Sequence, residues 1–349
     1  MNALITGGCG FVGSNLAAYL IDLTHTNKVT VFDNLSRHGA SANLTWLRTL
    51  ASAEHNPVEF VHGDIRNAFD VEAAIKQVEP DVIFHLAGQV AMTTSMQSPR
   101  RDFEINVGGS INVLETVRQY LPVTAIIYAS SNKVYGNLSH LDLVEVETRY
   151  QPRVLTQGVD ENVGIEFHTP YGCSKGAADQ YMLDYARGFG LNTVVFRHST
   201  IYGGRQFATF DQGWVGWFCR QAMEAKKNPG RPPFTVSGDG KQVRDLLHVS
   251  DAVRCYVAAY EHIGTARGHA FNIGGGIENS MSLLELLRYL EARLELKLDW
   301  THLPWRQSDQ KFFVADNGKA HRLIEWVPLT TREQGLETVI DWETEAAAL

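Results

Sequence analysis

The chain has few cysteines, no excess of basic residues and no long apolar run. Its cysteines, Cys9, Cys173, Cys219 and Cys255, form no CxxC pair and no metal-binding spacing, so we expect free thiols in a reducing cytoplasm and no metal. Lysine and arginine number 31 against 39 acidic residues, a balance that argues against nucleic-acid binding. No apolar run approaches the roughly 20 residues of a membrane helix. The first expected strand begins at once, so we expect no targeting leader.

Glycines recur at every third position in residues 6–13, which read TGGCGFVG. Gly7 permits a tight turn, and Gly10 lets the backbone approach a pyrophosphate. Gly13 lets the helix expected over Phe11–Leu20 pack closely on the preceding strand. The N-terminus of that helix offers free N–H groups and a positive dipole end to phosphates. This context predicts a dinucleotide-binding turn rather than an ordinary strand–helix connection.

A carboxylate follows the next expected strand. Lys28–Phe32 is apolar and ends in Asp33, twenty residues beyond Gly13, where a carboxylate can accept a hydrogen bond from a ribose 2′-hydroxyl. A 2′-phosphate would meet this carboxylate at close range, so we expect NAD rather than NADP. Arg37 complicates this expectation, because its guanidinium could reach a 2′-phosphate.

Apolar runs alternate with helical patterns, such as Asp70–Val78 and Gly108–Tyr120, through the first two-thirds of the chain. Buried strands separated by helices predict an α/β fold with a Rossmann-type, doubly wound parallel sheet, which binds ligands at the carboxyl ends of its strands. The expected strands are Asn2–Thr6, Lys28–Phe32, Val58–His62, Val82–Leu86, Ala125–Ala129, Thr193–Arg197 and a later run, His269–Gly274, that could rejoin the sheet.

The pattern loosens after about Ile201, which predicts a second, smaller α/β lobe built from separated segments. We assign residues 1–200 and 247–275 to an NAD-binding domain, and residues 201–246 and 276–349 to a substrate-binding lobe. Amphipathic helices are expected over Leu283–Leu294 and Gly335–Trp342, and the tail over residues 343–349 is expected to be frayed.

The residues that follow Ala125–Ala129 suggest redox chemistry. Ser131 lies in the run SSNKVYG after this strand, and Tyr171 and Lys175 follow, four apart on one helix face. An ammonium neighbour and an oxidised nicotinamide would lower the pKa of the Tyr171 phenol, so that it could take the proton of a substrate hydroxyl. Ser131 could hold the same oxygen. The alternatives are an exposed ion-pair spacing for Tyr171 and Lys175, and a cap or turn role for Ser131.

Here the chain resembles the extended short-chain dehydrogenase/reductase superfamily, which includes nucleotide-sugar epimerases and dehydratases. The resemblance covers nearly the whole length and rests on the glycine-rich turn, Asp33, residues 64–65 and 86–89, Asn106, Ser131, Tyr171, Lys175 and the run RDLLH at 244–248. It implies Ser131, Tyr171 and Lys175 as catalytic residues. The cofactor residues that it implies are Gly7, Gly10, Phe11, Val12, Gly13, Asp33, Asn34, Ser36, Arg37, Asp64, Ile65, Leu86, Ala87, Gly88, Gln89, Asn106, Tyr171, Lys175 and His198.

In that superfamily the positions of Asp64 and Ile65 hold the adenine, and His198 borders the nicotinamide. From its own context Asp64 could equally be a turn residue, and an isolated histidine such as His198 is more often structural. Five longer stretches are similar to the CDP-paratose (CDP-tyvelose) 2-epimerases: residues 32–37, 88–95, 131–136, 171–181 and 203–218. This similarity implies tightly held NAD, inversion at carbon 2 of a CDP-linked deoxyhexose, a cytoplasmic homo-oligomer (dimer or tetramer) and no membrane partner.

Two residues separate this chain from the sugar 4,6-dehydratases, which resemble it but carry Asp-Glu where this chain has Asn132 and Lys133. Those carboxyls exchange protons in the elimination of water, which an amide cannot do. We therefore expect no dehydration, and we expect Asn132 and Lys133 to contact the substrate. The alternative is that Lys133 simply points at solvent.

Basic groups in the second lobe suit a diphosphate, because the arginine fork matches phosphate oxygens. We expect Arg205, Gln206, Arg244, Arg306 and Asp309 at the substrate, although a structural ion pair is nearly as plausible for each arginine alone. The chain departs from many relatives after Arg197, with Thr200 and Gly204 in place of Asn and Pro. That departure leaves the local phosphate contact open.

Together these features predict oxidation of carbon 2 to a ketone with Tyr171 as base, rotation of the sugar about its link to the diphosphate, and reduction from the opposite face. The first alternative is a nucleotide-sugar 4-epimerase or 4,6-dehydratase on the same scaffold. The second is a non-catalytic NAD-sensing protein, which would hold NAD and turn over no nucleotide sugar.

Overall fold

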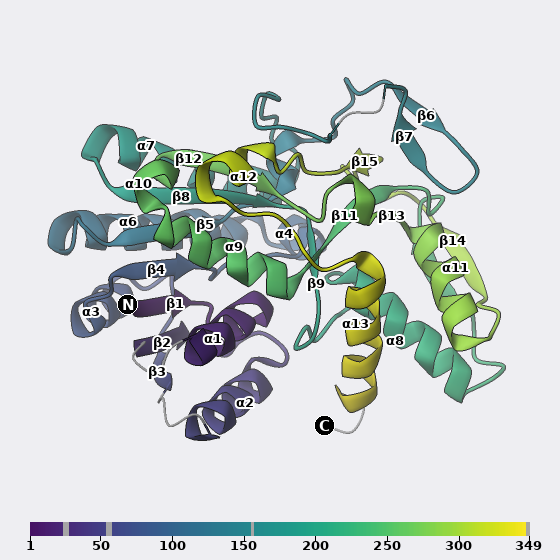
Figure 1. Cartoon of the computed structure of the whole chain (residues 1–349), viewed down its shortest axis with the longest axis horizontal. Coiled ribbons are helices and arrows are strands. Elements are labelled where there is room, and N and C mark those ends of the chain that lie inside the picture. The colour runs from purple at the N-terminus through teal and green to yellow at the C-terminus, as the bar shows by residue number, and fades with distance from the viewer. Residues whose placement is uncertain (24–27, 54–57, 155–156, 347–349) are drawn as a thin grey trace.

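The computed structural model describes residues 1–23, 28–53, 58–154 and 157–346. Its centre is a seven-stranded sheet in which every neighbouring pair is parallel (Figure 1). In spatial order the strands are β12 (His269–Ile273), β8 (Asn192–His198), β5 (Ala125–Ala129), β4 (Val82–His85), β1 (Asn2–Thr6), β2 (Lys28–Asp33) and β3 (Val58–His62).

The sequence located all of these strands. Three have the expected bounds. β4 and β12 end one residue early, β2 ends one residue late, and β8 extends one residue beyond its expected bounds at both ends, because the ladder can start or stop one residue away from the end of an apolar run. β12 does join the sheet, pairing with β8 at the edge. The near-continuous apolar runs of β1, β4 and β5 are buried on both faces, as expected of a covered parallel sheet.

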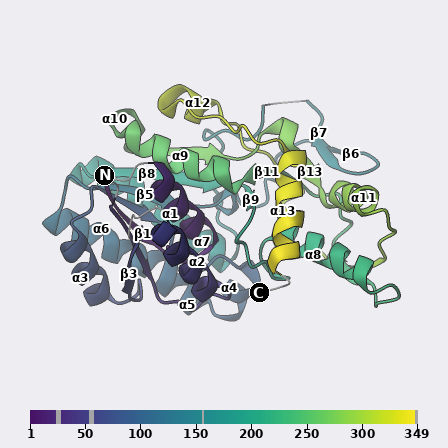
Figure 2. The same cartoon turned by 60° about the horizontal axis from the view of Figure 1, so that its bottom comes forward.

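Helices cover both faces of the sheet, which confirms the doubly wound α/β fold (Figures 1 and 2). One core lies under α1 (Phe11–Leu23), α2 (Ala40–Ala53) and α9 (Val249–Glu261), and includes Leu16, Leu47 and Val253. The core on the other face lies under α3 (Ala68–Val78), α6 (Gly109–Tyr120) and α7 (Thr169–Phe189). The shorter helices here are α4 (Met92–Gln97), α5 (Pro99–Phe103), α10 (Ile263–Ala266) and α12 (Gly318–Ile324).

Later segments build a separate group of elements beside the carboxyl ends of the strands (Figure 1). Its helices are α8 (Trp214–Lys227), α11 (Leu283–Leu294) and α13 (Arg332–Ala346), which share a third core with β10 and β11. Its strands are β9 (Thr200–Tyr202), β10 (Phe234–Ser237), β11 (Val243–His248), β13 (Ser280–Ser282), β14 (Trp300–Leu303) and β15 (Phe312–Phe313), and β6 (Leu143–Glu145) and β7 (Tyr150–Pro152) form a hairpin.

Two details concern the expected boundaries. The division expected between residues 246 and 247 falls inside β11, which pairs with β13 and β15 through its first half and with β9 through its second. The tail expected to fray from residue 343 is instead helical to Ala346, because Glu343 is buried and forms an ion pair with Arg220 at 2.7 Å. Residues 347–349 lie outside the described residues.

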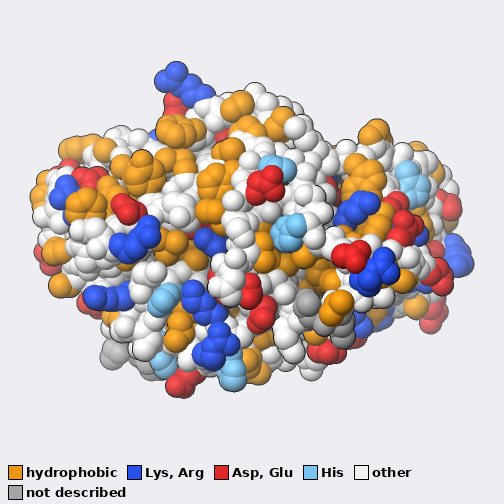
Figure 3. All heavy atoms as spheres, turned by 90° about the horizontal axis from the view of Figure 1, so that it is seen from above, with side chains coloured by type: hydrophobic (Ala, Val, Ile, Leu, Met, Phe, Trp, Pro, Cys, Tyr) orange, Lys and Arg blue, Asp and Glu red, His pale blue; other side chains and the backbone are white. Residues whose placement is uncertain are grey.

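The surface carries both signs of charge. On the face seen from above Figure 1, acidic and basic side chains are interspersed with hydrophobic ones (Figure 3). Among the described residues, no helix has both the length and the apolar character needed to cross a membrane.

Candidate active site

The turn between β1 and α1 has a shape that requires glycine at two positions. Gly7 has a φ of +70°, and a Cβ there would lie 2.7 Å from the backbone nitrogen of Ala87. A Cβ on Gly13 would lie 2.3 Å from the carbonyl oxygen of Gly7, so α1 packs directly on the turn. Gly10 donates its N–H to the same carbonyl at 3.0 Å. The first turn of α1 therefore starts at the edge of a cavity.

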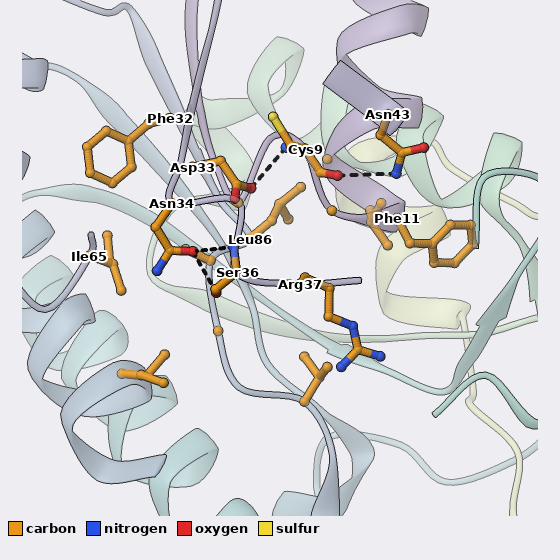
Figure 4. Close-up of a pocket in the computed structure, with 18 of the residues that line it drawn as sticks. Cys9, Phe11, Phe32, Asp33, Asn34, Ser36, Arg37, Asn43, Ile65 and Leu86 are labelled. Atoms are coloured by element: carbon orange, nitrogen blue, oxygen red, sulfur yellow. Dashed lines mark hydrogen bonds between the residues drawn. The ribbon is translucent and has the colours of Figure 1, made fainter. Parts of the chain in front are cut away.

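This first cavity has a volume of about 230 Å³ and lies at the carboxyl ends of β1 to β4 (Figure 4). Most of the residues expected at a dinucleotide line it, namely Gly7, Gly10, Phe11, Val12, Gly13, Asp33, Asn34, Ser36, Arg37, Asp64, Ile65, Leu86, Ala87 and Gly88. Residues from four different loops thus meet in one cavity, as the topology of a parallel sheet requires.

Asp33 ends β2 and holds two backbone segments in place. Its Oδ2 accepts the N–H of Cys9 at 3.0 Å (Figure 4), and its Oδ1 accepts the N–H of Leu35 at 2.8 Å. Burial raises the pKa of Asp33, and these two hydrogen bonds oppose the rise. Each carboxylate oxygen has a second lone pair, so the side chain can still accept a hydroxyl.

Asp64 forms a turn and also lies at the wall of the first cavity. It lines the first cavity and accepts the Asn34 side-chain amide at 3.1 Å. It also forms a turn, because its Oδ1 accepts the backbone N–H of Arg66 at 3.0 Å. Hydrogen bonds from the Arg66 guanidinium hold the pKa of Asp64 well below its usual range.

A second cavity of about 390 Å³ adjoins the first. The two share a common wall formed by Phe11, Val12, Leu86, Val90, Gln206 and Gln212. Expected substrate and catalytic residues meet in the second cavity: Ser131, Asn132, Lys133, Tyr171, Lys175, Gln206, Arg244, Arg306 and Asp309. His198, expected at the cofactor, lies here as well.

The helix α7 presents its reactive residues on a single buried face. Tyr171, Lys175 and Asp179 are spaced by four residues, and all three are buried. Asp179 forms a two-point ion pair with Arg197 of β8, with both N···O distances at 2.9 Å, and accepts the Ser130 hydroxyl at 2.9 Å. These contacts fix α7 against the carboxyl ends of β5 and β8.

The electrostatics of Tyr171 differ from the expectation. Burial raises the pKa of Tyr171 to about 12, and a side-chain hydrogen bond with Ser131 acts in the opposite direction. The Lys175 ammonium, expected to lower this pKa, donates instead to the carbonyl oxygen of Ala129 at 2.8 Å. Burial also lowers the pKa of Lys175 to about 8, with Asp102 opposing. A cationic Lys175 and a neutral Tyr171 thus lie side by side at neutral pH.

Gln89 and Asn106, expected at the cofactor, line neither cavity. Asn106 lies in a π-helical turn (Glu104–Gly108) and is 1% exposed. It accepts the backbone N–H of Gln89 at 2.9 Å and donates to Ser174 at 2.9 Å. The carboxylate of Asp102 joins the same buried network by accepting from Gln89 and Ser174. These residues brace the loop after β4 and the helix that carries Lys175.

Asn132 is held by a glutamine that the sequence did not single out. Its Nδ2 donates to Oε1 of Gln310 at 3.0 Å, and Nε2 of Gln310 donates to the Gly136 carbonyl at 2.7 Å. His198 is also structural in part, because its Nε2 lies 2.8 Å from the Tyr256 hydroxyl. Burial lowers the pKa of His198 to about 3, so its ring is neutral.

Lys133 does not point at solvent. Its side chain is 18% exposed, and its Nζ lies 3.4 Å from Oδ1 of Asp309. Arg244 donates to the same oxygen at 2.7 Å. Burial acts to raise the pKa of Asp309, but Lys133, Arg244 and Arg306 outweigh it and lower that pKa. We call these four residues the cationic cluster.

The comparisons with known proteins agree with this geometry. The model of the NAD dependent epimerase/dehydratase family matches residues 3–274. The chain belongs to this family. It is 56% identical over 342 residues to the CDP-paratose 2-epimerase of Salmonella typhi, a match that covers 98% of this chain and 99% of that protein.

Solved structures share the fold of this family member. A UDP-glucose 4-epimerase from Thermotoga maritima, with UDP-glucose, is 27% identical, with a TM-score of 0.83 over 99% of this chain and 100% of that one. A UDP-glucuronic acid 4-epimerase from Bacillus cereus, in complex with UDP-glucuronic acid and NAD, is 25% identical, with a TM-score of 0.82 over the same shares. The cofactor of this epimerase/dehydratase-family chain is NAD.

Arg205, which the sequence predicted to contact the substrate, does not line the second cavity. Arg205 lines the first cavity and not the second, with its guanidinium 4.3 Å from the ring centroid of Trp46 and 4.8 Å from that of Trp342. Its φ of +65° is unusual for a residue with a side chain. The ring pair turns Arg205 away from the second cavity, and Gln206 next to it lines both.

Thr200, at which the sequence left the phosphate contact open, lines the second cavity, but its hydroxyl accepts the Trp214 indole N–H at 3.2 Å. The sequence reasoning also missed several lining residues of α8 and β10, including Trp217, Phe218 and Thr235. Gln242 had a signal, because it stands two residues before Arg244 and directly before the start of β11. Trp217 and Phe218 had no such signal, because aromatic residues on a helix give the same sequence pattern whether they pack in a core or line a ligand site.

Proposed function

We propose that this chain is an NAD-dependent isomerase that inverts carbon 2 of a CDP-linked hexose of the paratose and tyvelose type. One observation carries the proposal. Tyr171 and Ser131 line the second cavity together, and the two residues that follow Ser131 are an amide and an amine rather than carboxyls. The geometry supports reversible oxidation of an alcohol, and the Salmonella typhi relative suggests the carbon and the nucleotide.

The first cavity fits NAD. The glycines at positions 7 and 13 leave no room for side chains, and the N-terminus of α1 suits a pyrophosphate. Asp33 can accept a ribose hydroxyl, and Asp64 with Ile65 lines the wall beyond it. When bound, NAD supplies the redox chemistry, because its nicotinamide can take a hydride from the sugar and return it.

The chain's own residues handle the proton. Tyr171 takes the proton of the carbon-2 hydroxyl, and Ser131, which lines the same cavity, holds the same oxygen. The Lys175 ammonium is held on the Ala129 carbonyl, so the positive charge of an oxidised nicotinamide, when bound, would be needed to favour the phenolate form that this step requires. Once carbon 2 is a ketone it is planar, so the sugar can turn and present its other face. Tyr171 then returns the proton.

The carboxyl groups that dehydration would need are absent at residues 132 and 133, which are Asn and Lys. Asn132 cannot exchange a proton, and its amide is already engaged by Gln310.

We further propose that the enzyme is a cytoplasmic homo-oligomer, a dimer or tetramer, of lipopolysaccharide O-antigen biosynthesis. The outer surfaces of α6 and α7 support association, because Tyr120, Tyr181 and Phe189 are exposed there. Light scattering of the purified protein tests this state.

The test of the function is to incubate the holoenzyme with CDP-paratose, CDP-glucose and UDP-glucose and to locate the inverted carbon by NMR. We expect inversion at carbon 2 of CDP-paratose. Inversion at carbon 4, loss of water, or no turnover of any nucleotide sugar would each reject the proposal.

An isotope experiment tests the route. Substrate carrying deuterium at carbon 2 should keep the label in ordinary water, and unlabelled substrate should gain none in heavy water. Washout would instead require a proton exchange at carbon 2 after oxidation elsewhere, and it would leave the fold and cofactor assignments unaffected.

A further inference from the structure

The cationic cluster matches the charge of a diphosphate. Lys133, Arg244 and Arg306 contribute three positive charges and Asp309 one negative charge, which leaves two positive charges in the second cavity. The diphosphate of a nucleotide sugar carries two negative charges. The cluster therefore suits this anion, and the question is which cation lies nearest the reacting carbon.

The two arginines are already engaged by protein atoms. Arg244 donates to Asp309 and to the Val243 carbonyl, each at 2.7 Å. Arg306 donates to the Phe210 carbonyl at 3.0 Å and lies over the Phe210 ring. These contacts fix both guanidinium groups, although each group has further N–H donors.

Lys133 is held more loosely. Its ammonium has three donors, and its contacts in the described part of the chain, to Asp309 and to the Ser308 carbonyl, are both 3.4 Å long. That distance exceeds the roughly 2.7–3.2 Å of a normal N–H···O hydrogen bond. A buried ammonium with such weak partners gains from an anion that can accept from it at a shorter distance.

Lys133 is also the cation tied to the catalytic residues. Its backbone N–H donates to Oγ of Ser131 at 3.2 Å, and Ser131 acts to lower the pKa of Tyr171. Ser131, Lys133 and Tyr171 line the same cavity. A phosphate on the Lys133 ammonium would therefore lie close to the residue that takes the proton.

This position has a consequence for which carbon reacts. In a nucleotide sugar the β-phosphate is attached through oxygen to carbon 1 of the hexose. Carbon 2 is bonded directly to carbon 1, whereas carbon 4 lies across the ring. An enzyme that oxidises carbon 2 needs its phosphate-binding cation close to its base, and an enzyme that oxidises carbon 4 needs the width of the ring between them.

We propose that Lys133 binds the β-phosphate of the nucleotide sugar and so presents carbon 2, rather than carbon 4, to Tyr171. This rests on the proposed function and deepens it, since it assigns the choice of carbon to one positioning residue. A carboxylate at residue 133, as in the dehydratases, would repel the phosphate from this position, so the sugar would have to enter differently.

The test compares the affinities of CDP and CMP for the NAD-loaded enzyme by calorimetry, because CMP lacks the β-phosphate. We expect Lys133→Met to weaken CDP binding about tenfold or more, as for loss of a charge-assisted hydrogen bond, and CMP binding by less than about threefold. Lys133→Arg keeps the charge and should recover most of the CDP affinity. Lys311→Met, which removes an exposed lysine outside the cavity, is the matched control.

A measurement on the unaltered enzyme covers the case in which the variants fold poorly or lose NAD. Burial lowers the pKa of Lys133 to about 8, with Asp309 opposing and Arg244 and Arg306 reinforcing the shift. The protonated ammonium binds phosphate, so the ratio of CDP to CMP affinity should fall as the pH rises through about 8. Lys175 in the same cavity also has a pKa of about 8, so this fall should disappear in Lys133→Arg, whereas a fall caused by Lys175 would persist there. Equal weakening of CDP and CMP in Lys133→Met, or a ratio that does not change with pH, would overturn the proposal.

The two proposals fail in different experiments. If NMR shows inversion at carbon 4, the proposed function and the carbon-selecting role fall together, whatever the CDP affinities are. If carbon 2 is inverted but Lys133→Met binds CDP normally, the function stands and Lys133 loses its role. With the role intact, the KM of Lys133→Met for the CDP-sugar should rise by at least the factor seen for CDP.

Discussion

Tyr171 lies buried in the first turn of α7, and its phenol lines the second cavity, where it can accept the substrate proton. Tyr171→Phe keeps the ring and removes the ionisable oxygen. We expect turnover to fall by about 100-fold or more while NAD stays bound, as for removal of a general base. Steady-state kinetics with cofactor quantification checks this, and near-normal turnover would remove Tyr171 from the mechanism.

Asp33 is a second single residue with a specific role, because its carboxylate should select NAD over NADP. Its carboxylate lines the first cavity, where a 2′-phosphate would be repelled. In Asp33→Ser we expect the ratio of NAD to NADP recovered from denatured protein to fall by about tenfold or more, from the loss of a charge–charge repulsion. Arg37→Ala added to this variant should remove the NADP if Arg37 is its partner. A ratio that does not change would show that Asp33 only braces Cys9 and Leu35.

At the scale of elements, the attachment of α7 to the sheet depends on the buried ion pair of Asp179 and Arg197, whose side chains are 1% and 6% exposed. Arg197→Met leaves a buried carboxylate without its cation, at a cost of about 3–5 kcal/mol in the free energy of unfolding. Urea denaturation measures this. The control is Arg187→Met on the same helix, an exposed pair with Asp184 that should change stability by less than about 0.5 kcal/mol. Equal stabilities would contradict the anchoring role.

The sequence specified the elements of the main sheet better than those beside it. β1, β4 and β5 are buried on both faces, so each reads as an unbroken apolar run and was located to within a residue. β9, β13 and β15 have two or three residues each and pair with β11 across long separations. Such short strands leave no periodic pattern, because their partners rather than their own residues define them.

The site shows the same division between local and long-range information. The glycine turn and the spacing of Tyr171 and Lys175 are local, and the structure brings these residues to two adjoining cavities. The contacts of the Arg205 guanidinium with the Trp46 and Trp342 rings join residues more than a hundred positions apart in the sequence. The same is true of the hydrogen bond between Asn132 and Gln310. No local pattern encodes these contacts, which is why the sequence did not place Arg205 at the first cavity.

At the scale of the whole molecule, residues 203–213 connect parts of the chain that are far apart in sequence. This segment lines both cavities, and Asn15 of α1 donates to its Gly204 carbonyl at 3.1 Å. Arg205 joins it to α2 through Trp46 and to the C-terminal α13 through Trp342. The segment therefore closes the first cavity with contributions from both ends of the chain.

This arrangement predicts how firmly the cofactor is retained. Two cation–π contacts contribute about 0.5–2 kcal/mol each, so Arg205→Ala should speed the loss of NAD by about tenfold or more. Radiolabelled NAD exchanged into the protein measures the rate. Turnover per bound NAD should stay close to normal, because Arg205 does not line the second cavity. Arg267→Ala, an exposed arginine that lines neither cavity, is the control for loss of charge. An exchange rate equal to that of the unaltered protein would mean that the segment rests over the cofactor without holding it, and that retention comes from the glycine turn and Asp33 alone.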